Sequence, residues 1–221
     1  GIDFYARFID GLLARGIEPM VCLYHFDMPL ALAEKYNGFV DRHVLDAFVR
    51  YGQKMIDCFG SKVKYWLTFN EQNIYHMPGA FQVGGYLKGE KTLRELYQIQ
   101  HHVMMAHVLL THYLHDTQPG KLMGGMLAHQ LIYPATCKPR DIFCAMQYDE
   151  FLNQSLLRVY AGQGYSPAVM AVVEKEGFGD IYRDEDLAQI ARVKNDFMAF
   201  SYYASKTLDS DAIGTDTPVN Y

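Results

Sequence analysis

The residues best suited to chemistry are Asn70-Glu71-Gln72, which directly follow the apolar, β-rich run of residues 64–69. Such an abrupt change is typical of a buried strand that delivers a side chain into a polar site. Apolar neighbours disfavour a charged carboxylate, which suits the Glu71 carboxyl to the role of a general acid. Asn70 can bind a substrate hydroxyl, and a carboxyl that protonates a leaving-group oxygen is the chemistry of glycoside hydrolysis. A lone glutamate at a strand end is more often only hydrogen-bonded or solvated, so that alternative stays open.

Polar side chains also end the other apolar runs of the chain. These side chains are His25, the pair His129-Gln130 and the pair Tyr202-Tyr203. The carboxyl ends of parallel strands meet at one rim of a barrel, where enzymes of that fold assemble their sites. We therefore expect these residues to lie at the same rim as Glu71.

The elements that must position these residues alternate along the chain. Continuous apolar runs predict strands over residues 17–24, 63–69, 121–130 and 197–203. Helical periodicity predicts helices that end near residues 16 and 60 and others over residues 29–36, 93–115, 140–160, 167–176 and 184–192. Residues 72–91 and 131–139 are expected to be loops, and a loop as long as the first is usually functional.

Strands that alternate with long helices indicate parallel strands joined by right-handed crossovers. This pattern leaves two architectures, an open doubly wound sheet and a closed (β/α)8 barrel. No glycine-rich phosphate-binding turn follows any of the four strands, which argues against a dinucleotide-binding fold. We expect an α/β fold in the form of a partial (β/α)8 TIM barrel, because four strands cannot close one.

Composition limits the partners of the chain. The 221 residues are 50% hydrophobic and can form a single domain, residues 1–221, with a sizeable core. A net charge of -5 predicts no nucleic-acid partner, and no apolar run approaches the roughly 20 residues that span a bilayer. The four cysteines lack metal-type spacing, so we expect a reduced, cytoplasmic protein. The chain opens within a helical pattern without an initiator methionine, which suggests that its start is missing.

Two further groups of residues favour no special site. The five histidines of the helix over residues 93–115 lack the His-Glu-x-x-His arrangement, so we expect no metal and no other cofactor. Lys138 and Arg140 could attract a phosphate, although a solvated loop is the more frequent outcome for such residues.

Three motifs resemble glycoside hydrolase family 1, the β-glucosidase family of (β/α)8 barrels. Residues 68–73, Thr-Phe-Asn-Glu-Gln-Asn, resemble the Thr-Phe/Leu-Asn-Glu-Pro/Gln motif of that family. Residues 25–29, His-Phe-Asp-Met-Pro, look like its third-strand motif, and residues 196–203 look like its sixth-strand motif. Ala199 replaces the glycine that is usual in the last motif. The resemblance implies that the chain corresponds to about strands three to six of the eight.

The resemblance also implies roles for single residues. Glu71 would be the general acid/base and Asn70 the partner of the sugar 2-hydroxyl, while His25 would contact hydroxyls of the glycone. Tyr203 would hydrogen-bond the nucleophilic carboxylate. Ser201 and Gln72 look most like the bacterial 6-phospho-β-glucosidase branch. The expected substrate is therefore a phosphorylated disaccharide or an aryl glucoside phosphate.

The chain also departs from the family, because the seventh-strand motif that carries the nucleophile has no counterpart in it. Asp27 belongs to its own motif, Asp149 and Glu150 fall within a predicted helix, and Asp196 precedes its strand. A retaining site needs two carboxyls, so we expect this polypeptide alone not to hydrolyse glycosides at a useful rate. The alternatives are a non-catalytic sugar-binding fragment and a half-barrel that assembles as a homo-oligomer.

Overall fold

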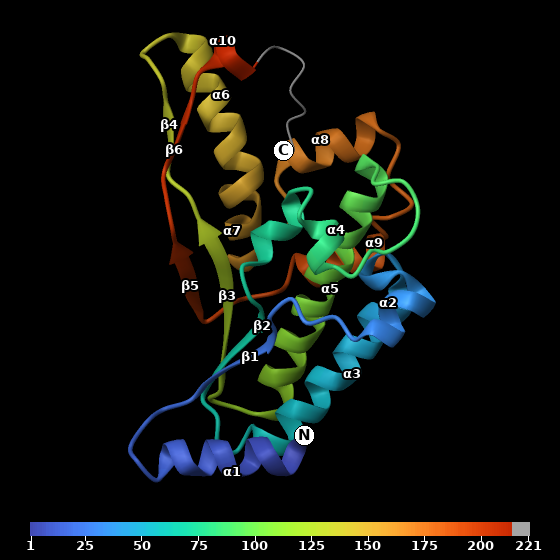
Figure 1. The fold of residues 1–221 in the computed structure, drawn as a ribbon, viewed down its shortest axis with the longest axis vertical. Coiled ribbons are helices and arrows are strands. Elements are labelled where there is room, and N and C mark those ends of the chain that lie inside the picture. Colours follow the sequence, from blue (N-terminus) through green and yellow to red (C-terminus); the bar gives the residue numbers. More distant parts are fainter. Residues whose placement is uncertain (214–221) are drawn as a thin grey trace.

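A computed structural model describes residues 1–213. Its central elements alternate between helix and strand (Figure 1). The strands are β1 (Met20–Tyr24), β2 (Tyr65–Phe69), β3 (Leu122–His129), β4 (Ile132–Pro134), β5 (Phe197–Tyr202) and β6 (Lys206–Leu208). The helices are α1 (Ile2–Leu13), α2 (Leu30–Tyr36), α3 (Arg42–Phe59), α4 (Ala80–Val83), α5 (Leu93–Thr117), α6 (Pro139–Asp149), α7 (Ser155–Tyr160), α8 (Pro167–Lys175), α9 (Asp184–Ile190) and α10 (Ser210–Ile213). Shorter helical turns are η1 (Gly38–Val40), η2 (Gln72–His76) and η3 (Glu150–Gln154).

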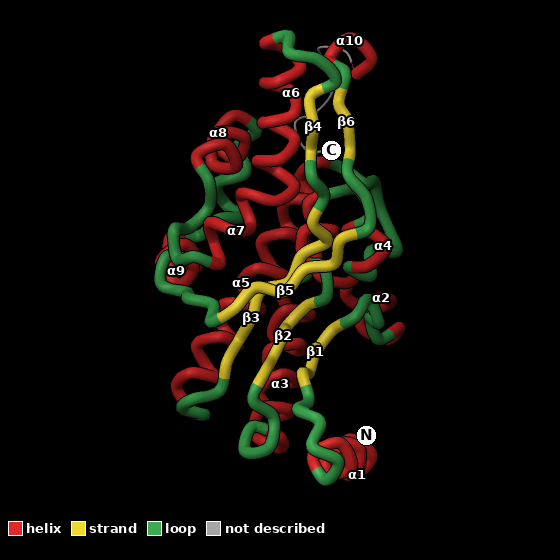
Figure 2. The backbone as a smooth tube through the Cα atoms, turned by 90° about the vertical axis from the view of Figure 1, so that its left-hand side faces the viewer, coloured by secondary structure: helices red, strands yellow, loops and turns green. Residues whose placement is uncertain are grey.

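The four predicted strands form one parallel sheet in the order β1-β2-β3-β5. The sheet follows the order of the chain, so each crossover connects neighbouring strands, as in a barrel. Figure 2 shows the strands side by side with their helical layer behind them. The predicted parallel α/β arrangement is thus confirmed.

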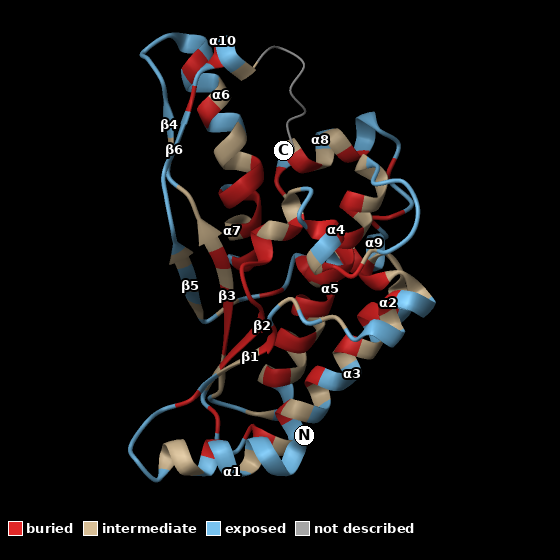
Figure 3. Ribbon diagram, viewed as in Figure 1, coloured by how far each residue is buried: buried red, intermediate tan, exposed pale blue. Residues whose placement is uncertain are grey.

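Helices α3, α5 and α7 cover one face of the sheet. Thr68 of β2 bonds to His107 of α5 with 2.7 Å between Oγ1 and Nδ1, so this side chain points toward the helices. The main apolar core lies in this layer and includes Trp66, Phe69 and most of the inner face of α5 (Figure 3). Among residues 1–213 no helix is long and apolar enough to cross a membrane.

The predicted helix over residues 93–115 begins as the sequence indicates. Thr92 occupies the N-cap of α5, and its hydroxyl donates to the Glu95 carboxylate. The strand predicted over residues 17–24 begins only at Met20. Pro19 has no N–H to donate to a neighbouring strand, which accounts for the later start.

Three segments differ from the prediction. The expected loop over residues 72–91 contains η2 and α4, and the expected loop over residues 131–139 contains β4, which pairs with β6. The helix expected over residues 140–160 is divided by the π-turn η3. Strands of three residues and single π-turns are too short to leave a periodic apolar pattern, and this is why the sequence did not reveal them.

Candidate active site

The four strands of the main sheet end at one rim. Tyr24 lies opposite Phe69 in the register of β1 and β2, and His129 lies opposite Tyr202 in that of β3 and β5. The residues that follow these strands therefore leave the sheet at the same end. They are His25, Asn70 with Glu71, Gln130 and Tyr203.

Glu71 turns sharply out of β2. Its backbone is left-handed, with φ 44° and ψ 57°, and the residue is only 6% exposed. The hydroxyl of Tyr203, which follows β5, donates a hydrogen bond to Glu71 Oε1. The structure thus joins two residues 132 positions apart that the sequence placed at one rim. Tyr203 was expected beside a nucleophilic carboxylate, and within the described chain its partner is Glu71 instead.

Asn70 presents an available amide beside Glu71. Its backbone N–H donates to the Tyr24 carbonyl at 2.9 Å, which continues the pairing of β1 and β2 by one residue. The side chain is buried, and its amide makes no hydrogen bond to another described residue. An unpaired amide at this position can both donate to and accept from a hydroxyl group.

His25 lies on the open side of the rim. The residue is exposed, its backbone N–H donates to Asp27 Oδ1 at 3.0 Å, and its ring lies edge-on to Phe26 with centroids 5.3 Å apart. Phe26 has a positive φ of 69°, so the chain turns sharply immediately after His25. The structure shows no direct contact between His25 and Glu71 among its hydrogen bonds and ring pairs.

Two neighbours of Glu71 are anchored in ways that the sequence analysis missed. Gln72 is 2% exposed, and its Oε1 accepts a hydrogen bond of 2.6 Å from the Tyr160 hydroxyl. Asn73 is 1% exposed, and its amide makes two hydrogen bonds of 2.8 Å to the backbone of Ala128. The signal that could have found them is the run of three buried amides around one carboxylate, since buried amides require partners.

The other carboxylates named above have different partners. Asp27 accepts from the His25 backbone, and Asp149 accepts from the Asn153 and Gln154 side chains at 2.6 and 2.9 Å. Asp196 accepts from the Met123 backbone N–H at 2.8 Å, at the opposite end of the sheet. Glu150 lines a separate groove against α8. None of these four carboxylates is hydrogen-bonded to Glu71 or Tyr203 within the described residues.

The buried histidines of α5 are held by hydrogen bonds within the protein. Besides Thr68, His107 contacts Asn195 with 3.0 Å between Nε2 and Oδ1, and His102 contacts the Phe39 carbonyl with 2.8 Å between Nδ1 and O. Burial lowers the pKa of both rings to about 4, so they are neutral near pH 7. No group of three potential ligands suited to a metal ion occurs within residues 1–213.

The two cations considered for a phosphate site pair with a carboxylate instead. Lys138 Nζ lies 2.8 Å from Asp211 Oδ2, and Arg140 lies 3.9 Å from the same carboxylate group. Both basic side chains are more than half exposed. They form a solvated surface cluster at the start of α6 with Asp211 of α10.

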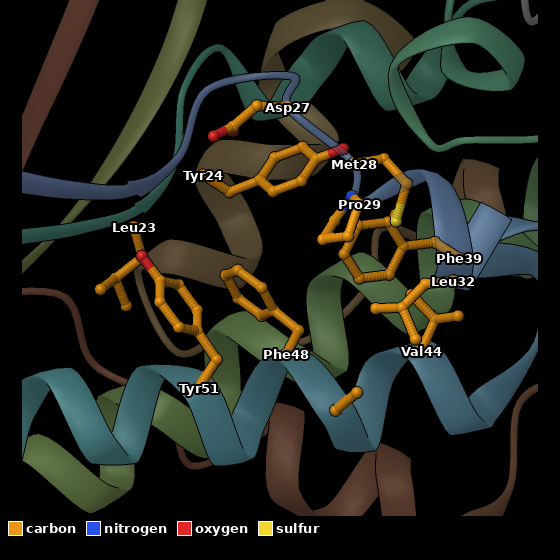
Figure 4. A pocket seen from close by; sticks show the side chains of 11 residues that line it. Leu23, Tyr24, Asp27, Met28, Pro29, Leu32, Phe39, Val44, Phe48 and Tyr51 are labelled. Atoms are coloured by element: carbon orange, nitrogen blue, oxygen red, sulfur yellow. The ribbon is translucent and has the colours of Figure 1, made fainter. Parts of the chain in front are cut away.

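A cavity of about 260 Å³ opens between the end of β1 and α3 (Figure 4). Its walls are largely apolar and aromatic, with Asp27 as the one carboxylate. The lining residues are Leu23, Tyr24, Asp27, Met28, Pro29, Leu32, Phe39, Val44, Ala47, Phe48 and Tyr51. None of the predicted site residues Glu71, Asn70, His25 and Tyr203 lines it, although Tyr24 and Asp27, on either side of His25 in the chain, do.

Comparison with known proteins relates this rim to a family. The model of glycosyl hydrolase family 1 matches residues 1–220. The chain is 36% identical to the 6-phospho-beta-glucosidase AscB of Escherichia coli over 212 residues, which cover 96% of the chain and 44% of that protein. It is 34% identical to the aryl-phospho-beta-D-glucosidase BglA of Bacillus subtilis, covering 98% of the chain and 46% of that protein. The chain thus spans somewhat less than half the length of these curated relatives.

Solved structures agree with the sequence matches. The family 1 β-glucosidase of Thermotoga maritima, in complex with isofagomine lactam, has a TM-score of 0.80 at 27% identity. The match covers 95% of this chain and 47% of that one. The AHE enzyme of Alicyclobacillus herbarius has a TM-score of 0.81 at 28% identity, with the same two coverages. The expected partial (β/α)8 barrel is confirmed, and the chain belongs to glycosyl hydrolase family 1.

Proposed function

We propose that the chain supplies the general acid/base of a retaining glycoside hydrolase that cleaves β-glycosidic bonds. The observation that carries this proposal is the position of Glu71, a buried carboxyl at the strand-end rim that receives a hydrogen bond from Tyr203. As an acid, Glu71 would protonate the oxygen of the leaving group. It would then act as a base toward the water that releases the sugar from the second carboxylate.

The other predicted site residues fit roles around this carboxyl. The free amide of Asn70 would bind the sugar 2-hydroxyl, and the exposed ring of His25 would bind hydroxyls of the glycone. Tyr203 has one hydroxyl proton and can serve one carboxylate at a time. We propose that it donates to the nucleophile when that group is present and to Glu71 otherwise.

The proposed substrate class is 6-phospho-β-glucosides, either disaccharides or aryl glucosides. The names of the Escherichia coli and Bacillus subtilis relatives support the phosphate, and Ser201 and Gln72 favour the same branch. We further propose that the enzyme is cytoplasmic, needs no cofactor and binds no nucleic acid. Residues 1–221 are proposed to form one domain, since the two apolar clusters share Leu93 and Tyr165.

A second candidate is a non-catalytic fragment that binds sugar or assembles as a half-barrel. It is favoured by the lack, within residues 1–213, of a second carboxylate that is hydrogen-bonded to Glu71 or Tyr203. A retaining mechanism needs a second carboxyl about 5 to 5.5 Å from the first. The sheet edges also favour assembly. Within residues 1–213, β1 and β5 each have one unpaired edge, and Met198, Phe200 and Tyr202 of β5 are exposed.

A chimera separates the candidates. Residues 1–221 would replace the matching segment of the Escherichia coli relative, so that the rest of that protein supplies the other strands. We expect the chimera to hydrolyse 4-nitrophenyl 6-phospho-β-glucoside and to prefer it over the unphosphorylated glucoside. The 221-residue chain alone would serve as the comparison, with calorimetric titration to measure sugar binding.

The matched control uses a carboxylate outside the site. Glu174 lies on α8 and is exposed, so Glu174→Gln should leave the hydrolysis rate unchanged. The proposed role of Glu71 as general acid/base would be rejected if a folded chimera with Glu71→Gln hydrolysed its substrates, including those with poor leaving groups, at the unmodified rate. A folded chimera without turnover, together with sugar binding by the chain alone, would favour the non-catalytic candidate.

A further inference from the structure

Strands β2 and β3 separate before β3 ends, which leaves part of the β3 backbone without a neighbouring strand on that side. The two strands pair only as far as Leu67 and Gly124, whereas β3 continues in register with β5 to His129. In a parallel sheet the N–H and C=O of one residue point to the same neighbouring strand. Beyond Gly124, the β2-facing backbone groups of β3 therefore need partners other than a strand.

The Asn73 side chain, two residues after Glu71, provides two of these partners. Asn73 Oδ1 accepts from the Ala128 N–H and Asn73 Nδ2 donates to the Ala128 carbonyl, both at 2.8 Å. This amide side chain takes the place of a peptide group of the absent strand. Closer to the end of the pairing, the Tyr160 ring packs against Gly125 of β3, and its hydroxyl donates to Gln72 Oε1 at 2.6 Å.

These contacts hold the backbone of Glu71, the proposed general acid/base, in place. Glu71 is not a glycine and has a left-handed backbone, a conformation that persists only when the surroundings impose it. On its N-terminal side the Asn70 N–H is bonded to β1 at 2.9 Å. On its C-terminal side Asn73 is bonded to β3. The backbone of Glu71 is thus held between two strands.

We propose that Asn73 is a positioning residue that keeps Glu71 in the left-handed conformation and so directs its carboxyl toward the rim. The catalytic consequence rests on the proposed function, whereas the conformational claim does not. An amide side chain is required at position 73, because the Ala128 N–H needs an acceptor and the Ala128 carbonyl needs a donor. Aspartate at this position would place a carboxylate oxygen against the Ala128 carbonyl.

The first test measures the conformational claim alone. Glu71→Gly and Glu71→Ala both remove the carboxyl, but only glycine adopts a positive φ without strain. When Asn73 is unchanged, we expect the melting temperature of Glu71→Gly to be about 2–4 °C higher than that of Glu71→Ala. With Asn73→Ala or the milder Asn73→Asp, this difference should disappear, because the turn is no longer imposed.

Asn153 provides a matched control. It is also a buried asparagine that bonds to the end of β3, with Nδ2 donating to the Gln130 carbonyl at 3.0 Å. Asn153→Ala should leave the difference between Glu71→Gly and Glu71→Ala intact. A difference that persists undiminished in both Asn73 variants overturns the proposal.

The second test follows catalysis in the chimera. Misplacing a general acid slows substrates with poor leaving groups most, so Asn73→Ala should make the dependence of kcat/KM on leaving-group pKa steeper, as a loss of general-acid catalysis does. Asn153→Ala should leave that dependence unchanged. An unchanged dependence in Asn73→Ala would overturn the catalytic part of the proposal. If a folded chimera shows no turnover, the proposed function is rejected. The melting temperatures of the Glu71 variants still test whether Asn73 keeps Glu71 in the left-handed conformation.

Discussion

Replacing Gly125 with alanine links the packing of the core to the active site. A Cβ at this position would lie 2.3 Å from Cε2 and 2.4 Å from Cδ2 of the Tyr160 ring. Ordinary contacts between carbon atoms are about 3.5–4.0 Å, so the ring would have to move by more than about 1 Å. Tyr160 packs against His107, with ring centroids 5.1 Å apart, and its hydroxyl is bonded to Gln72. The ring is 3% exposed, so a displacement of this size disturbs at least one of these contacts.

The size of the effect follows from these contacts. Overpacking a well-packed core costs about 1–3 kcal/mol, and loss of the bond between Tyr160 and Gln72 adds about 1 kcal/mol. We expect Gly125→Ala to lower the free energy of unfolding by about 2–4 kcal/mol. In a protein of this size, each kcal/mol lowers the melting temperature by about 2–4 °C.

Urea denaturation followed by tryptophan fluorescence measures this change, because Trp66 is the one tryptophan of the chain and is fully buried. Gly179→Ala is the control, since a Cβ there meets no atom within 4 Å. It should change the free energy of unfolding by less than about 0.5 kcal/mol. An equally small effect of Gly125→Ala would refute the reasoning.

Two further predictions concern buried titratable side chains. Asp186 is buried and accepts hydrogen bonds of 2.7 and 2.9 Å from the two terminal guanidinium nitrogens of Arg42. Asp186→Ala should therefore lower the free energy of unfolding by about 3 kcal/mol in the same denaturation experiment, and an unchanged midpoint would contradict this. Burial lowers the pKa of His102 and His107 to about 4, whereas the unfolded chain binds these protons near pH 6.5. Stability should therefore decrease as the pH falls from about 6.5 to about 4, by about 1.4 kcal/mol per pH unit for each ring. His107→Gln should reduce that slope, and an equal slope in both proteins would contradict the assignment.

The sequence predicts the four main strands because each is a continuous apolar run bounded by polar residues or turns. It also predicts that Glu71 stands at a strand end, because the change from Phe69 to Asn70 marks the end of the buried segment. Both signals are local, and the parallel order of the strands follows from the helices between them.

The contacts that support Glu71 are not local. Asn73 and Ala128 are 55 positions apart, and Gln72 and Tyr160 are 88 positions apart. A bond from a side chain to a distant backbone leaves no periodic pattern in a sequence. Sequence reasoning therefore locates the carboxyl and leaves unresolved what holds it.

The leaving-group dependence of Glu71→Gln in the chimera tests the central claim most directly. If Glu71 is the proton donor, kcat/KM for an alkyl 6-phospho-β-glucoside should fall by about 10²- to 10⁴-fold. A dinitrophenyl substrate, whose leaving group needs no proton, should be cleaved in its first step at close to the unmodified rate. Equal losses for both substrates would contradict the assignment of Glu71 as the general acid.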